Sequence, residues 1–331
     1  MVKRPVSWFL AAGLLLVSCG SGDDPTTGDT AAVSTSPDGS DQGDDDEPVV
    51  PGSATTEAGA ALTVTRDVRF AADAPDLARW SDPMFDVYSP SEAIDLPLVV
   101  ILPPHALTKE NPASVQLANA LVEQRMVAVV TNWSELDEPV GFFQDPAIFT
   151  EVTRASQSVA GCAVSSAVSH ASEYGADPSR LVLVGELFGA NAASMIALGT
   201  PDPFTGCGVT DVTWNVSGFV GLNGDWMVGF PMFDAVAEAA VETLSPWSVL
   251  DQAPQIPTVL AFTNDYVNLT QNCEDPTSWL TSRDPTGSMS ARLDASDAAA
   301  DGCIDNGEQA QATTAEMSSH GLEAEVVALV N

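Results

Sequence analysis

One short stretch near the middle of the sequence constrains the fold more than any other part. Residues 181–184 form an apolar run that is typical of a buried strand, and Ala190 begins a run of small residues that predicts a helix. Gly185 and Gly189 lie between them and predict a sharp turn in which backbone segments approach closely. A strand that turns directly into a helix indicates a βα unit, and such units build parallel sheets.

Strand and helix signals alternate through the rest of the globular part. Residues 62–70 and 84–88 read as strands, and we expect them to pair in antiparallel fashion. Further strands are predicted at 97–102, 126–131, 214–222, 257–262 and 322–330, and helices at 112–125, within 145–174, and at 309–320. We expect a single α/β domain over residues 61–331, with a mainly parallel sheet of about eight strands flanked by helices.

The N-terminus has the features of an export signal. Lys3 and Arg4 precede an apolar run at residues 6–17, which is too short to span a bilayer as a stable helix. The run ends in Leu16-Val17-Ser18-Cys19-Gly20, which resembles the lipobox of bacterial lipoproteins. The resemblance implies a signal peptide at 1–18, lipidation of Cys19, and an exported protein anchored to the outer face of the bacterial cell membrane or cell envelope. An ordinary signal peptide with a chance cysteine is the alternative.

The segment after the signal and the charge of the chain limit the partners. Residues 19–60 contain no Lys or Arg and too few apolar residues to form a core, so we expect a disordered acidic tether. The chain has 11 Lys and Arg against 46 Asp and Glu, which gives a formal net charge of -35. Such a surface repels nucleic acid and anionic lipid headgroups. The lipobox resemblance implies that the protein reaches the membrane through the lipid on Cys19. No protein partner, metal or other cofactor is indicated.

Four cysteines follow Cys19, namely Cys162, Cys207, Cys273 and Cys303. An even number in an exported protein predicts disulfides, and three connectivities are open. We favour Cys273–Cys303, which closes one polar excursion, and Cys162–Cys207, which joins segments on either side of the central turn. A metal site is disfavoured because no pair has C-x-x-C spacing and no histidine lies beside a cysteine.

The segment Gly185-Glu186-Leu187-Phe188-Gly189 has the layout of the G-x-S-x-G nucleophile elbow, which holds a serine on a tight strand-to-helix turn. Residues 85–90, 98–102, 117–130, 172–185 and 257–265 add further similarity in the same order. The globular part therefore resembles the esterase/lipase, or carboxylesterase-like, branch of the α/β-hydrolase superfamily over nearly its whole length. The resemblance implies that fold and a site with a serine, a histidine base, an acid and backbone oxyanion donors.

The resemblance places Leu187 where the nucleophilic serine belongs, and a leucine side chain has no atom that can attack a carbonyl group. Glu186 lies one residue from the apex, so we expect a surface or hydrogen-bonding role for it. The acid position falls at Asn264 or Asp265; spacing favours Asn264, and residue type favours Asp265 as a remnant.

The histidine base of the family follows the last strand, where this sequence has none. His170 falls in the long predicted helix, and His320 ends the helix before the last strand. His105 follows the third predicted strand, where the family often has His-Gly before its oxyanion loop. Ala106 replaces that glycine, so the oxyanion loop is expected to be degenerate.

These substitutions predict an exported, membrane-anchored α/β-hydrolase-like lipoprotein without hydrolase activity, retained as a binding or interaction module. A small apolar or ester-like ligand would bind beside Leu187, Phe188 and Trp133. Two alternatives stay open: an active carboxylic-ester hydrolase with an atypical constellation, and a purely structural envelope protein. The candidate residues of the atypical constellation are Glu186, Asp265, His105 and Ser194.

Overall fold

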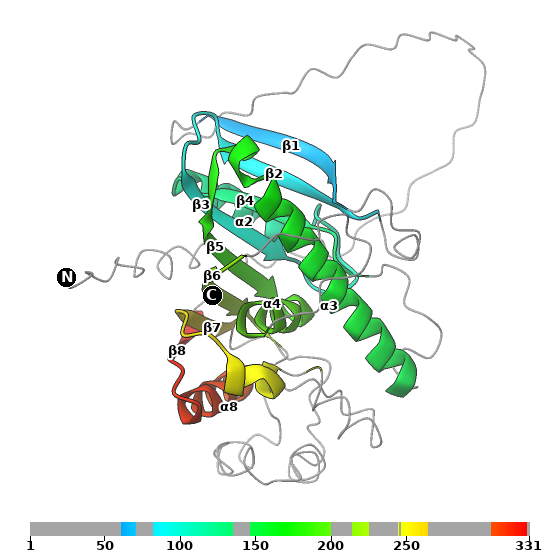
Figure 1. Cartoon of the computed structure of the whole chain (residues 1–331), viewed down its shortest axis with the longest axis vertical. Coiled ribbons are helices and arrows are strands. Elements are labelled where there is room, and N and C mark those ends of the chain that lie inside the picture. Colours follow the sequence, from blue (N-terminus) through cyan, green and yellow to red (C-terminus); the bar gives the residue numbers. More distant parts are fainter. Residues whose placement is uncertain are drawn as a thin grey trace, which may run out of the picture.

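In the computed structural model of the chain, the described residues are 61–70, 82–134, 146–199, 214–224, 244, 246–263 and 306–329. They form one sheet with helices on both faces (Figure 1). The predicted signal peptide and the tether lie outside the described residues. Among the described helices, none has the length and apolar character that a membrane crossing requires.

The sheet has eight strands in the order β1-β2-β4-β3-β5-β6-β7-β8. The first two pairings, β1 with β2 and β2 with β4, are antiparallel, and all later pairings are parallel. The prediction of an antiparallel opening followed by a parallel sheet is confirmed. The strands are β1 (Leu62–Arg69), β2 (Met84–Pro90), β3 (Leu96–Leu102), β4 (Val127–Thr131), β5 (Ala176–Glu186), β6 (Val216–Leu222), β7 (Thr258–Thr263) and β8 (Ala324–Leu329).

Alternate residues of the central strands divide the core into two layers. Leu98, Val100 and Leu102 of β3 belong to one hydrophobic cluster, whereas Val99 and Ile101 belong to the other. The first layer packs against α3 (Pro146–Ser169), α4 (Phe188–Leu198) and α8 (Asn306–Ser319). The second packs against α2 (Pro112–Glu123), so the sheet is covered on both sides.

Two element boundaries differ from the sequence prediction. The long helix ends at Ser169, and a 3-10 turn, η2 (Ala171–Tyr174), completes the segment before the left-handed Gly175. Strand β5 begins at Ala176, five residues earlier than predicted, because its first half is largely exposed and polar and so has no apolar signal. A second 3-10 segment, η3 (Pro246–Gln252), precedes β7.

Candidate functional site

The turn between β5 and α4 has the geometry of an elbow. Leu187 stands at its apex with φ 54° and ψ -121°. A Cβ on Gly185 would lie 2.2 Å from the carbonyl oxygen of Gly189, and a Cβ on Gly189 would lie 2.3 Å from that of Leu102. Both glycines are therefore required by close backbone approach, as the sequence predicted.

Leu187 occupies this apex in a backbone region that side chains other than glycine rarely adopt. Its N–H donates to the carbonyl oxygen of Leu222 at 2.9 Å, and its own carbonyl accepts from Ala190 N–H at 3.0 Å. The turn is thus tied to β6 and to the first turn of α4. The apex side chain is half-buried and offers no nucleophilic atom.

Glu186 lies at the carboxyl end of β5, opposite Leu222 of β6. Val182 and Val184 belong to the cluster that α2 covers, so strand alternation places Glu186 on that same face. Burial raises the pKa of its carboxyl group above the ordinary value. Its carboxyl makes no hydrogen bond or ion pair with another described residue, so a role as a hydrogen-bonding glutamate within the described fold is not observed.

His105 is half-buried and packs among aromatic rings. Its ring lies edge-to-face against Trp133 and Phe188, with centroid separations of 6.1 and 5.6 Å. Phe188 in turn lies edge-to-face against Phe149 of α3, with a ring-centroid separation of 6.3 Å. Burial lowers the pKa of His105 to about 4, so the ring is neutral at pH 7.

The loop between β3 and α2, where the resemblance places an oxyanion loop, is tied to the segment after β4. Trp133 Nε1–H donates to the carbonyl oxygen of Pro103 at 2.7 Å. The N–H of Ala106, a residue with φ 63°, donates to Ser134 Oγ at 2.9 Å. The N–H of Lys109 donates to Asn132 Oδ1 at 2.7 Å.

Three consecutive residues, Asn132, Trp133 and Ser134, therefore hold three points of this loop. Of these three residues, only Trp133 was predicted from the sequence to lie at the site. A signal was available in the polar residues Asn132 and Ser134, because they directly follow a fully buried strand, where parallel sheets place their functional side chains.

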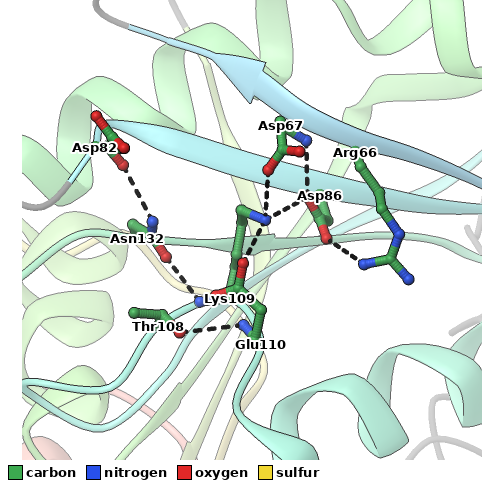
Figure 2. Close-up of polar contacts among 8 residues, drawn as sticks. All are labelled: Arg66, Asp67, Asp82, Asp86, Thr108, Lys109, Glu110 and Asn132. Atoms are coloured by element: carbon green, nitrogen blue, oxygen red, sulfur yellow. Dashed lines mark hydrogen bonds and ion pairs between the residues drawn. The ribbon is translucent and has the colours of Figure 1, made fainter. Parts of the chain in front are cut away.

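Sequence reasoning also missed an ion cluster beneath the loop (Figure 2). Lys109 Nζ lies 2.8 Å from Asp67, 2.9 Å from Asp86 and 2.7 Å from Glu110. Arg66 bonds the second oxygen of Asp86 at 3.1 Å. Asp86 is fully buried and the Lys109 side chain is 4% exposed, whereas the side chains of Arg66, Asp67 and Glu110 are exposed.

The other two histidines lie at the opposite edge of the sheet from Leu187. His170 stands just before η2 and the start of β5, where its Nδ1 lies 2.9 Å from the carbonyl oxygen of Ser166. His320 follows α8 and precedes β8, and it contacts Asp251 at 2.8 Å and Glu316 at 3.1 Å. Because β5 and β8 run parallel, residues before them lie at the amino ends of the strands.

Ser194 is fully buried in α4, and its hydroxyl donates to the carbonyl oxygen of Asn191 at 2.7 Å. The structure therefore does not bring Ser194 to the apex of the elbow. The cluster of Asn191 with Gln157 and the carbonyl of Leu244 packs α4 against α3 in the same region.

Several predicted site residues lie outside the described residues: Cys19, Asn264, Asp265, Cys207, Cys273 and Cys303. Cys162 is buried on α3 and is disulfide-bonded. The proposed pairings stay predictions, as does the remnant acid. Among the described residues, no group of three or more His, Cys, Asp or Glu side chains is placed to hold a metal ion.

Comparison with known proteins identifies the architecture. No protein-family model matches the sequence, and no curated protein matches it. Inhibited esterase B from Lactobacillus rhamnosis aligns with TM-score 0.51 at 11% identity, over 84% of this chain and 77% of the esterase. Its tributyrin phosphonate-inhibited form aligns with TM-score 0.52 at 12% identity, over 81% and 74%.

A thermophilic esterase from the planctomycete Thermogutta terrifontis aligns more weakly, with TM-score 0.49 at 14% identity over 82% of each chain. The two alignments with esterase B have TM-scores above 0.5, and identities this low show a shared fold alone. With the strand order and the elbow turn, they show that this chain has the α/β-hydrolase fold found in esterases.

Proposed function

We propose that this protein is an exported, lipid-anchored lipoprotein with an α/β-hydrolase fold that does not hydrolyse esters and acts as a binding or interaction module. The observation that carries the proposal is Leu187 at the apex of an otherwise intact elbow. Ester hydrolysis on this fold requires a nucleophile at that point. Without one, only the small residual rate that substrate binding and oxyanion contacts provide is left.

The positions of the histidines support the proposal. Of the three in the sequence, His170 and His320 stand at the amino ends of the strands, away from the elbow. His105 stands at the correct end, but its ring is enclosed by Trp133 and Phe188, and burial lowers its pKa to about 4. A base with so low a pKa holds a proton poorly at pH 7.

The loop after β3 gives a further argument. An oxyanion hole needs backbone N–H groups directed at the developing charge. The N–H of Ala106 instead donates to Ser134 Oγ. A ligand would have to compete with that internal acceptor.

Among the described residues, the atypical-hydrolase alternative has no geometric support. Glu186 extends to the face of the sheet that α2 covers, whereas His105 packs with Trp133, Phe188 and the other layer of the core. These two groups therefore do not form a nucleophile–base pair across the elbow.

The ligand class proposed for the module is small and apolar or ester-like. Among the described residues, the apex carries the aliphatic Leu187, and the next residue, Phe188, packs through His105 with Trp133, so these side chains favour apolar contact. Lipidation at Cys19 would tether the protein to the membrane, with the acidic segment up to residue 60 as a spacer. A structural spacer without a ligand is the remaining outcome that an experiment must separate.

The test uses the full-length lipoprotein and its Leu187→Ser variant. We expect that neither protein turns over p-nitrophenyl butyrate above background and that neither is labelled by a fluorophosphonate probe, because introducing the serine does not supply the missing base. Stoichiometric serine labelling of the unaltered protein would refute the proposal. A thermal-shift screen of short-chain esters and fatty acids then distinguishes a binding module from a spacer, since a ligand that binds only the folded state raises the Tm.

A further inference from the structure

Lys109 joins three parts of the molecule that are distant in sequence. It belongs to the β3–α2 loop, Asp67 lies in a bulge of β1, and Asp86 lies in the middle of β2 (Figure 2). The bulge itself is fixed by Asp67 N–H, which donates to Asp86 Oδ1 at 2.9 Å. The ammonium group of Lys109 thus fastens the loop to the outer hairpin of the sheet.

The bonding capacity of the ammonium group is fully used. Lysine has three N–H donors, and three carboxylate oxygens lie between 2.7 and 2.9 Å from Nζ. Burial lowers the pKa of Lys109, but the hydrogen bonds that its ammonium group donates to Asp67, Glu110 and Asp86 outweigh this effect, so the pKa is raised above its ordinary value. The side chain is therefore a permanent cation and is unsuited to act as a nucleophile or base.

The backbone of the same residue is held from the other side. The N–H of Lys109 donates to Asn132 Oδ1, and Asn132 Nδ2 donates in turn to the carbonyl oxygen of Asp82 at 3.1 Å. Both the side chain and the main chain of Lys109 are thus held in place, and Lys109 lies only four residues after His105. The N–H of Leu107 donates to the carbonyl oxygen of Pro104 and closes the turn that contains His105.

We propose that Lys109 is a positioning residue that keeps the β3–α2 loop closed over the elbow, with His105 held between Trp133 and Phe188. This proposal rests on the proposed function in one respect, because it takes the loop as part of the ligand site. It adds that the site is closed in the resting protein by an ion cluster outside the site. Releasing that cluster would open the loop and expose the His105 ring.

The test is the titration of His105 by NMR in the full-length protein and in Lys109→Met, which keeps the length of the side chain and removes its charge. In the unaltered protein the ring should titrate near its lowered pKa of about 4. In Lys109→Met we expect the midpoint to rise by about one to two pH units towards the ordinary value of about 6.5. Amide exchange of residues 104–108 should quicken at least about tenfold.

Arg66→Gln is the matched control, because Arg66 bonds the same carboxylate of Asp86 but makes no contact with the loop in the cluster. It should leave both the titration and the exchange unchanged. A folded Lys109→Met protein with an unmoved His105 titration would overturn the proposal.

If Lys109→Met does not fold, Asp67→Asn replaces it. Asp67 is exposed, and its removal leaves Asp86 and Glu110 on the ammonium group. We expect a smaller shift of the same sign, and no shift would equally overturn the proposal. Ester turnover by the unaltered protein would refute the proposed function but would not change the His105 titration. A failure of the proposed function and a failure of the role of Lys109 are therefore distinguishable.

Discussion

Replacing Leu187 by alanine and by glycine measures the strain stored at the elbow. The observed φ of 54° and ψ of -121° mirror φ -54° and ψ 121°, which is an ordinary extended conformation. Glycine adopts both conformations about equally well, whereas any residue with a Cβ is strained in the first. Alanine and leucine share that Cβ, so the alanine-to-glycine step isolates the backbone contribution from the loss of side-chain burial.

The expected difference follows from two opposing effects. A non-glycine residue in such a region costs on the order of 1 to 3 kcal/mol. Glycine loses about 0.5 to 1 kcal/mol more conformational free energy on folding than alanine. Leu187→Gly should therefore be more stable than Leu187→Ala by about 1 kcal/mol, and by about 2.5 kcal/mol at most.

Urea unfolding of both variants gives the comparison, and an exposed helix position supplies the control. At Gln116 in α2, glycine should instead be less stable than alanine by about 1 kcal/mol. If glycine is also the less stable residue at position 187, the apex carries no strain and the reasoning is wrong.

Three further predictions concern residues around the elbow. Gly185→Ala should destabilise the fold by about 3 kcal/mol or more in urea unfolding, because its Cβ would lie 2.2 Å from a carbonyl oxygen. In the control Gly218→Ala nothing lies nearer to the Cβ than 3.6 Å, so stability should change by about 0.5 kcal/mol or less, and equal losses would contradict the prediction. Glu186→Gln should raise the Tm at pH 7 and leave it unchanged at pH 4, since a raised carboxyl pKa means that ionisation on going to pH 7 opposes folding. The pKa of His105 is lowered to about 4, so its stabilising contribution is complete above about pH 6.5 and disappears as the pH falls towards 4; His105→Phe should remove about 3 kcal/mol of the change in stability between these two pH values, and an unchanged pH dependence in urea unfolding would contradict this.

The fold was predictable because its signals are local. Apolar runs define β3, β4 and the second half of β5, and two glycines four residues apart define the elbow. The start of β5 was missed because residues 177–180 are exposed and polar, and they form strand only through pairing with the start of β3. Such pairing depends on tertiary neighbours and leaves no periodic trace in the sequence.

The candidate site was predictable only in part, for the same reason. The apex residue and His105 could be found because they stand at fixed offsets from buried strands. The cluster of Lys109 with Asp67 and Asp86 joins residues up to 42 positions apart, and each looks like an ordinary charged residue in its own segment. Only the register of β1 on β2 brings Asp67 beside Asp86.

The geometry of the elbow also explains how the apex side chain can change while the fold persists. A Cβ on Gly189 would strike the carbonyl oxygens of Leu102 and Pro103, so packing of α4 against the end of β3 fixes the turn. The bonds that the apex residue makes to Leu222 and Ala190 are backbone bonds, so they do not depend on which side chain it carries. A serine there would serve only chemistry, so its exchange for leucine costs the framework little beyond the strain that any non-glycine residue carries. The strained turn is thus a requirement of packing, and its presence in a chain is evidence of the fold and not of catalysis.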